Sequence, residues 1–127
     1  MSNGVYGAEA MEYLAKLENG ISTAPFKYIG LSTDTLEPKS GQIEMPGEVT
    51  TGGGERAEAT ASYEAPGIAV WTHTFTFSAD VSIAKIGIFD APSGGHMLLQ
   101  GLLSKVKPVE SGDDLTIIAK DSNSPVV

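Results

Sequence analysis

Hydrophobic and polar positions alternate along much of the chain after Pro25, and this period of two is typical of half-buried β-strands. The alternation is strongest at 69–77, where Trp71, His73, Phe75 and Phe77 share one predicted face and Val70 and three threonines share the other. Shorter runs predict further strands at 26–32, 56–63, 81–89, 97–103 and 115–119. Residues 106–109 would extend the 97–103 strand after a kink at Pro108. Strands at this spacing, separated by glycine-rich and acidic turns, predict a mainly β fold, an antiparallel β-sandwich that is jelly-roll-like.

A single segment near the N-terminus has helical periodicity instead. In residues 8–18 the apolar side chains of Ala10, Tyr13, Leu14 and Leu17 fall on one helical face, and Asn19-Gly20 follows as a stop signal. A helix of about three turns is marginal on its own, so this stripe must pack on its own sheet or on a neighbouring subunit. We expect the stripe to pack on a neighbouring copy of the chain or on the surface of a partner protein.

These patterns divide the chain into three parts. Residues 1–25 form an N-terminal helical arm, residues 26–120 form the β-sandwich domain, and residues 121–127 form a flexible tail. Inside the domain, residues 34–55 lose periodicity and contain two prolines and five glycines, which predicts a long loop with a short edge strand around 42–44. A loop of this length in a compact domain is usually functional or an interaction arm.

Negative charge is concentrated in and after this loop. Residues 34–64 contain seven acidic residues against Lys39 and Arg56, so they carry −5 of the total net charge of −8. Such a segment would favour a basic or mixed-charge partner surface, or it would simply keep a protein of many copies soluble. The same charge balance argues against nucleic-acid binding, which needs clustered cations.

Composition excludes several other classes of protein. The 127 residues include no cysteine, which rules out a disulfide scaffold and thiolate metal sites. No apolar run is long enough for a membrane span, and the start of the chain does not resemble a signal peptide, so we expect synthesis in a cytoplasm and no membrane partner.

No pattern of catalytic or cofactor-binding residues stands out. His73 and His96 have no recognisable metal spacing, no G-x-S-x-G elbow is present, and Gly52-Gly53-Gly54 is not followed by the lysine and helix of a phosphate loop. We therefore predict a protein that is not an enzyme and binds no cofactor or metal. The aromatic row at 71–77 could line a sugar site, but alternating aromatics favour a sandwich core. The predicted core contains Tyr28, Leu31, Trp71, Phe75, Ile86, Ile88, Leu99 and Leu115, with His73 at least partly buried.

Three stretches together resemble a known family. They are Tyr28–Thr33 (YIGLST), Gly52–Ala57 (GGGERA) and Ile86–Gly101 (IGIFDAPSGGHMLLQG), the last followed by VESGD at 109–113. This combination is similar to small virion structural proteins of tailed phages, which are tail-fibre-like or minor structural proteins. The family pattern usually has an aromatic residue where this chain has Glu55. The resemblance covers about residues 28–117.

The resemblance implies a virion component that is assembled in the host cytoplasm. Its partners would be other capsid or tail proteins, and it would act as a homo-oligomer, in a trimer or ring. Three hypotheses remain open: a tail- or fibre-associated structural protein, a capsid decoration (cement) protein, and a small carbohydrate-binding domain. For the first two, the candidate partner interface consists of Tyr13, Leu14, Leu17, Glu44, Glu48, Gly53, Glu55, Arg56 and His96.

Overall fold

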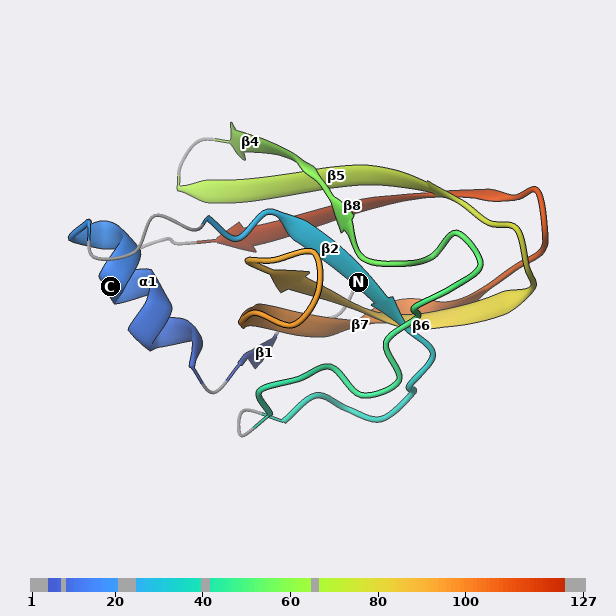
Figure 1. Ribbon diagram of the computed structural model, residues 1–127, viewed down its shortest axis with the longest axis horizontal. Coiled ribbons are helices and arrows are strands. Elements are labelled where there is room, and N and C mark those ends of the chain that lie inside the picture. The colour runs from blue at the N-terminus through green and yellow to red at the C-terminus, as the bar shows by residue number, and fades with distance from the viewer. Residues whose placement is uncertain (1–4, 8, 21–24, 40–41, 65–66, 123–127) are drawn as a thin grey trace.

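The computed structural model describes residues 5–7, 9–20, 25–39, 42–64 and 67–122, which form two facing antiparallel sheets and one helix (Figure 1). Sheet A has the strand order β1-β7-β6-β2-β3, and sheet B has the order β4-β5-β8. The elements are β1 (Val5–Tyr6), α1 (Ala10–Glu18), β2 (Tyr28–Ser32), β3 (Ala57–Glu58), β4 (Thr60–Glu64), β5 (Ile68–Thr76), β6 (Val81–Phe89), β7 (Met97–Val109) and β8 (Asp114–Ser122). The predicted antiparallel sandwich with one short helix is confirmed.

The strand predicted at 56–63 is two strands in different sheets. Ala59 is buried between β3 and β4, and the chain passes there from sheet A to sheet B. This crossing closes one side of the sandwich. Strand β7 continues through Pro108 to Val109. It is paired with β1 only at Leu99 and Gln100, so at Pro108 it is the edge strand of sheet A, and proline is tolerated at a sheet edge.

Other differences lie at the ends of elements. The short edge strand predicted at 42–44 is wrong: the described residues of the 34–55 loop form only an isolated bridge, between Glu48 and Ser32. Strand β8 continues through Asp121 to Ser122, so these two residues of the predicted tail belong to sheet B. The rest of that segment, 123–127, lies outside the described residues.

The main core lies between the two sheets. Six of the eight predicted core residues are buried, namely Leu31, Trp71, Phe75, Ile86, Ile88 and Leu99, whereas Tyr28 and Leu115 are half-buried. The indole Nε1 of Trp71 donates a 2.6 Å hydrogen bond to the carbonyl of Phe26, so this ring is satisfied inside the domain. His73 is half-buried as predicted, and its ring meets the edge of the Phe75 ring. The aromatic row is therefore core, and it offers no exposed platform for a sugar.

The 34–55 loop forms a third layer on the outer face of sheet A. Met45 is 4% exposed and packs with Phe89, Met97 and the half-buried Tyr28 in a second apolar cluster. Tyr28 differs from the prediction for this reason, since it points to the loop and not to the space between the sheets. The loop can approach closely because Gly30 and Gly87 have no side chain: a Cβ on either would lie within 3 Å of the Phe89 ring.

Polar contacts hold this layer in place. The Ser32 hydroxyl donates to the carbonyl of Pro46, and the fully buried Lys85 ammonium donates to the Asp34 carboxylate.

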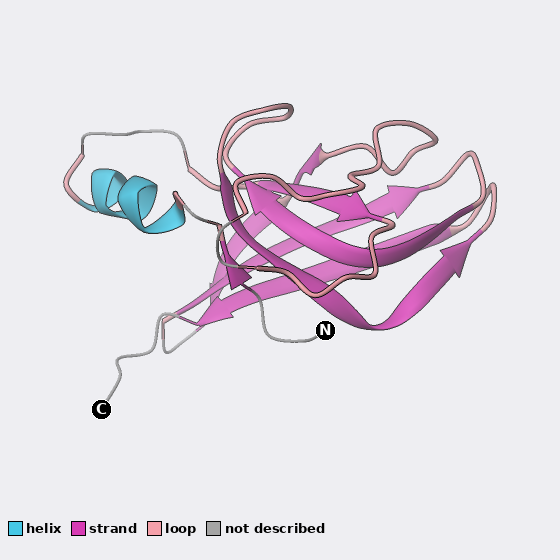
Figure 2. Ribbon diagram, turned by 90° about the horizontal axis from the view of Figure 1, so that it is seen from below, coloured by secondary structure: helices cyan, strands magenta, loops and turns pink. Residues whose placement is uncertain are grey.

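The helix lies beyond one end of the sheets (Figure 2). Its Tyr13, Leu14 and Leu17 side chains pack, partly buried, against the main core. The apolar stripe of the helix thus has a partner within its own domain and does not need a neighbouring copy to cover it.

Candidate functional site

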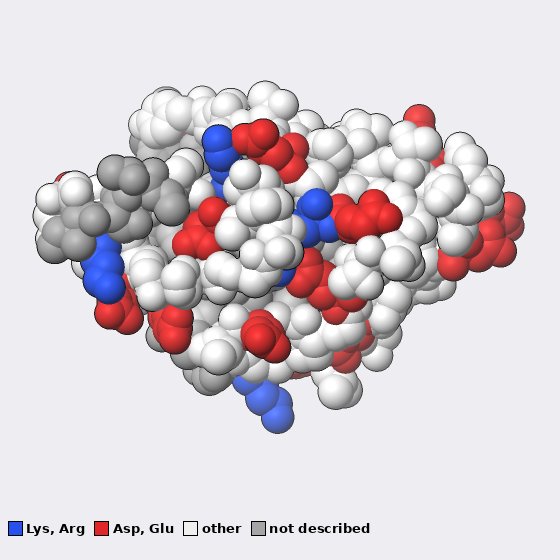
Figure 3. Space-filling model, in the orientation of Figure 1, with Lys and Arg blue, Asp and Glu red and all other residues white. Residues whose placement is uncertain are grey.

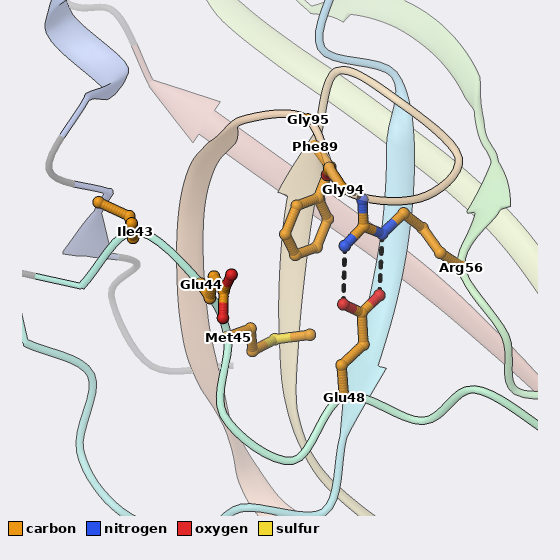
Figure 4. A pocket seen from close by; sticks show the side chains of 8 residues that line it. All are labelled: Ile43, Glu44, Met45, Glu48, Arg56, Phe89, Gly94 and Gly95. Atoms are coloured by element: carbon orange, nitrogen blue, oxygen red, sulfur yellow. Dashed lines mark hydrogen bonds and ion pairs between the residues drawn. The ribbon is translucent and has the colours of Figure 1, made fainter.

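Arg56 is the centre of the site, because its guanidinium joins the 34–55 loop to the end of β6 and the turn that follows β6 (Figure 4). Its Nε and Nη2 donate to the two carboxylate oxygens of Glu48, at 2.8 and 2.7 Å. Its Nη1 donates to the carbonyls of Ala91 and Gly94 in the turn between β6 and β7. The guanidinium carbon also lies 3.6 Å from the centroid of the Phe89 ring, in cation–π contact. Arg56 therefore fixes the 34–55 loop and the 90–96 turn to the face of sheet A.

The glycine run before Arg56 fixes the position of the backbone from which the Arg56 side chain extends. Gly53 has a φ of +88°, and a Cβ at this position would lie 2.1 Å from the carbonyl oxygen of Thr76. A Cβ on Gly54 would lie 2.9 Å from the Phe77 ring. The Glu55 carboxylate accepts a hydrogen bond from the Gly53 N–H and closes the turn. These glycines let the chain pass close to the end of β5, and they do not cradle a phosphate.

The 90–96 turn has its own internal support. The Asp90 carboxylate accepts from the His96 backbone N–H at 2.7 Å and lies 3.0 Å from Nδ1 of the His96 ring. Gly95 has a φ of +66°, and a Cβ there would lie 2.5 Å from Asp90 Oδ1. The His96 ring also contacts helix α1. The Tyr13 ring stacks on the imidazole, with ring centroids 3.7 Å apart, and the Glu9 carboxylate lies 3.8 Å from Nε2 of His96. His96 thereby connects the turn to helix α1.

Two hollows flank the Arg56 side chain. One, of about 300 Å³, has an apolar wall of Met45 and Phe89 and a polar wall that includes Glu44 and Glu48; Ile43, Arg56, Gly94 and Gly95 complete its lining. The second, of about 280 Å³, lies between the loop and the turn and is lined by Glu48, Val49, Thr50, Glu55, Arg56, Pro92, Ser93 and Gly94. Because Glu48 and Arg56 neutralise each other, the free charge at the first hollow is the exposed carboxylate of Glu44.

Electrostatically the visible face is predominantly acidic, and most of its basic groups lie beside an acid (Figure 3). Lys85 hydrogen-bonds to Asp34 and, together with the backbone N–H of Leu36, lowers the pKa of that carboxyl. The pKa of Tyr6 is raised to about 12, first because the ring is partly buried and then because its hydroxyl donates a 2.6 Å hydrogen bond to Asp121. These groups fasten elements together and do not converge on one of the hollows.

The structure gathers most of the residues predicted as an interface into two neighbouring groups. Glu44, Glu48, Gly53, Glu55 and Arg56 belong to the loop layer and its glycine turn, and Tyr13 and His96 form the stacked pair. Leu14 and Leu17 pack on the core.

Glu48 and Arg56 differ from the other predicted interface residues, because their charges are satisfied by each other. The Arg56 side chain is 8% exposed, so it is a structural clamp.

Sequence reasoning missed Met45, Phe89 and Gly94 as parts of this site. Phe89 and Gly94 lie in the longest of the three motifs, so the motif itself could have pointed to them. Met45 had no such signal, because it lies in a loop without periodicity.

The three stretches that resemble phage structural proteins thus meet at one place: the β2 strand lies beneath, the glycine turn supplies Arg56, and the β6–β7 hairpin supplies Phe89 and the turn carbonyls. A family model described as Podophage GP4 fiber I protein gp80 matches residues 12–123. The chain belongs to this family. It is therefore a phage fibre-like structural protein, a component of the virion that associates with other virion components. No curated protein matches the chain.

Within the described residues, no three histidine or acidic side chains are placed to hold a metal ion. The described part of the chain also contains no helix that is long and apolar enough to cross a membrane.

Proposed function

We propose that this protein is a non-enzymatic component of the phage tail or its fibres, assembled in the host cytoplasm, that acts through protein–protein contacts in a symmetric homo-oligomer. The observation that carries the proposal is the extent of the family match, which includes most of the helix, every strand of both sheets except β1, and the Arg56 clamp. Two of the motif stretches and Glu48 of the loop form one hydrogen-bonded unit, in which Arg56 donates to the Glu48 carboxylate and to the turn carbonyls. Such an arrangement supports a role in holding shape.

The outer layer offers the contacts. Leu36 and Ile43 are 71% and 56% exposed, and each is followed directly by an acidic residue, Glu37 or Glu44. An apolar surface with carboxylates beside it fits a partner that presents apolar side chains with basic groups at the rim. We assign this role to the 34–55 loop, with the helix end at Tyr13 and His96 next to it.

Gold-labelled antibody against this protein, applied to purified virions and viewed by electron microscopy, tests the proposal. Label on the tail or its fibres is the expected result. Label on the head shell would instead favour the decoration-protein alternative, and virions free of the protein would reject a structural role.

Replacement of Glu44 by Gln tests the loop, with Glu18→Gln on the exposed end of the helix as the control. We expect incorporation into virions to be weaker and less dependent on salt for Glu44→Gln alone.

A further inference from the structure

Two acidic side chains remain without an ion pair on either side of the Arg56 clamp. Glu44 lines the first hollow and Glu55 lines the second, and both residues are exposed. Neither carboxylate takes part in an ion pair among the described residues, and the charge of Arg56 is neutralised by Glu48. The hydrogen bond that Glu55 accepts comes from the uncharged backbone N–H of Gly53. Each hollow therefore carries one negative charge that the described part of the chain does not neutralise.

The shape and lining of the hollows fit long basic side chains. Each hollow has an apolar wall, formed by Met45 and Phe89 in the first (Figure 4) and by Val49 and Pro92 in the second. Their volumes, about 300 and 280 Å³, lie at the lower limit of pockets that hold small molecules. A lysine buries its methylene stem on apolar surface and keeps its ammonium group at the polar end, where a carboxylate can meet it. Each hollow therefore offers what one lysine side chain requires.

The chain has two lysines that are available for such a contact. Of its eight basic residues, five are ion-paired, namely Lys16, Lys27, Arg56, Lys85 and Lys120. Of the other three, Lys105 and Lys107 lie in the exposed stretch 104–108 of β7, beyond the residues that pair with β1. Residues i and i+2 of a strand lie on the same face, about 7 Å apart. Both lysines line one groove, so they form a basic pair in a protein of net charge −8.

We propose that Lys105 and Lys107 of one copy occupy the two hollows of a second copy, where their ammonium groups meet Glu44 and Glu55. The two hollows share the Arg56 side chain in their linings, so they are adjacent, as the two lysines are. Unpaired acids and unpaired bases of the same chain would thus neutralise each other between copies. This contact names the partner of the 34–55 loop, and it rests on the proposed function, in which the protein acts as a homo-oligomer.

Apolar side chains accompany both charged sites. Ile43 is 56% exposed at the first hollow, and Leu103 and Leu115 are half-buried in the groove that the two lysines line. Exposed ion pairs contribute little free energy, so burial of these apolar side chains would supply affinity, whereas the charges would set the orientation.

The same charges determine the symmetry of the contact. Two lysine sites that face each other would bring only ammonium groups together, and two loop sites would bring only carboxylates together. Both arrangements cost free energy, because like charges repel. The contact therefore joins unlike surfaces, head to tail, and such contacts generate a ring when the rotation closes.

Charge reversal at each site tests the proposal by analytical ultracentrifugation of the full chain. The lysine variant is Lys105→Glu with Lys107→Glu, and the acid variant is Glu44→Lys with Glu55→Lys; all these positions are exposed, so both variants should fold, which circular dichroism checks. Glu18→Lys is the control, because Glu18 is exposed at the end of α1 and lines neither the hollows nor the groove. We expect oligomers for the wild type and the control, which dissociate as the salt concentration rises, and monomers for each variant alone.

Mixing the two variants gives the decisive measurement. Opposite charges then face each other at both kinds of contact, so oligomers that contain both variants should form. A mixture that stays monomeric, or a variant that assembles alone like the wild type, would overturn the proposal. A wild-type protein that is monomeric in solution, although the antibody finds it on the tail, would overturn this contact and leave the structural role standing.

Discussion

The Lys85 ammonium has no exposure to solvent and lies 2.8 Å from the carboxylate of Asp34, which is 51 residues earlier in the chain. This ion pair fastens the start of the 34–55 loop to β6. A buried ammonium is tolerated only with its partner, because a charge in the interior loses its hydration.

Asp34→Asn should therefore destabilise the domain by about 3 kcal/mol, at the lower end of the range for broken buried pairs because the carboxylate still touches water. Lys85→Met should cost less, since it removes the charge that needs a partner. Urea unfolding measures both free energies. Equal stability of Asp34→Asn and the wild type would show that the pair does not hold the loop.

The lowered pKa of Asp34 also predicts a pH dependence. A carboxyl with a lower pKa in the folded state contributes stability above its ordinary pKa of 3.8, and this contribution is lost as the pH falls through the lowered value. The wild type should lose more free energy of unfolding than Asp34→Asn below about pH 4. A parallel acid dependence in the two proteins would contradict this.

Tyr6 predicts the opposite behaviour in alkali. Its pKa is raised to about 12, so the stability from the neutral hydroxyl is present below the ordinary value of 10.0 and is lost as the pH rises toward 12. In a titration of tyrosinate absorbance, the Tyr6 step should lie near pH 12, and Tyr6→Phe should remove that step. If Tyr6→Phe leaves a step near pH 12 in place, that step does not belong to Tyr6.

Arg56→Lys should be far from conservative. Lysine cannot donate in parallel to both oxygens of Glu48 and also reach the carbonyls of Ala91 and Gly94, so we expect a loss of about 2 kcal/mol or more. The 34–55 loop should become more sensitive to proteolysis. Lys27→Ala is the matched control, because its ion pair with Glu58 is exposed and should matter little. Loop cleavage at the wild-type rate in Arg56→Lys would refute the clamp.

Gly53→Ala and Gly112→Ala separate steric clash from backbone strain. Both glycines have a positive φ, which costs an alanine about 1–2 kcal/mol. Only at Gly53 does the new Cβ also meet backbone, 2.1 Å from the Thr76 carbonyl oxygen, whereas nothing lies within 4 Å at Gly112. Thermal unfolding should show the larger loss for Gly53→Ala, and similar losses would mean that the glycine turn is not tightly packed against β5.

The alternating strands could be predicted from the sequence because their side chains report directly which face is buried. Val81–Phe89 matches its prediction at both ends, and the row from Trp71 to Phe77 is core as expected. The loop layer could not be predicted in the same way. Met45 packs on Phe89 and Met97, and Lys85 pairs with Asp34, so both are buried by contacts with residues far away in sequence. The burial of Met45 also depends on the missing side chains of Gly30 and Gly87. A pattern of period two has no information about such a third layer.

The candidate site shows the same division. The sequence pointed to Arg56, Glu48 and His96 as residues of interest, but it suggested a partner outside the chain for each. In the structure their first partners are internal, because a guanidinium that is 8% exposed must satisfy its donors nearby. Charge in a sequence shows that a residue needs a counter-charge, and the fold determines whether the counter-charge is in the same molecule.

The covering of one sheet and not the other gives the domain a front and a back. The loop layer with its carboxylates lies over sheet A, whereas no described segment covers the outer face of sheet B, which bears Thr74 and Thr116 hydrogen-bonded to each other. In a ring of copies related only by rotation, every loop layer would have the same orientation with respect to the axis. The assembly would then have two chemically distinct walls from a single kind of subunit: one formed by the loop layer with its carboxylates, and one formed by the strands of sheet B with Thr74, Thr116 and Ile118.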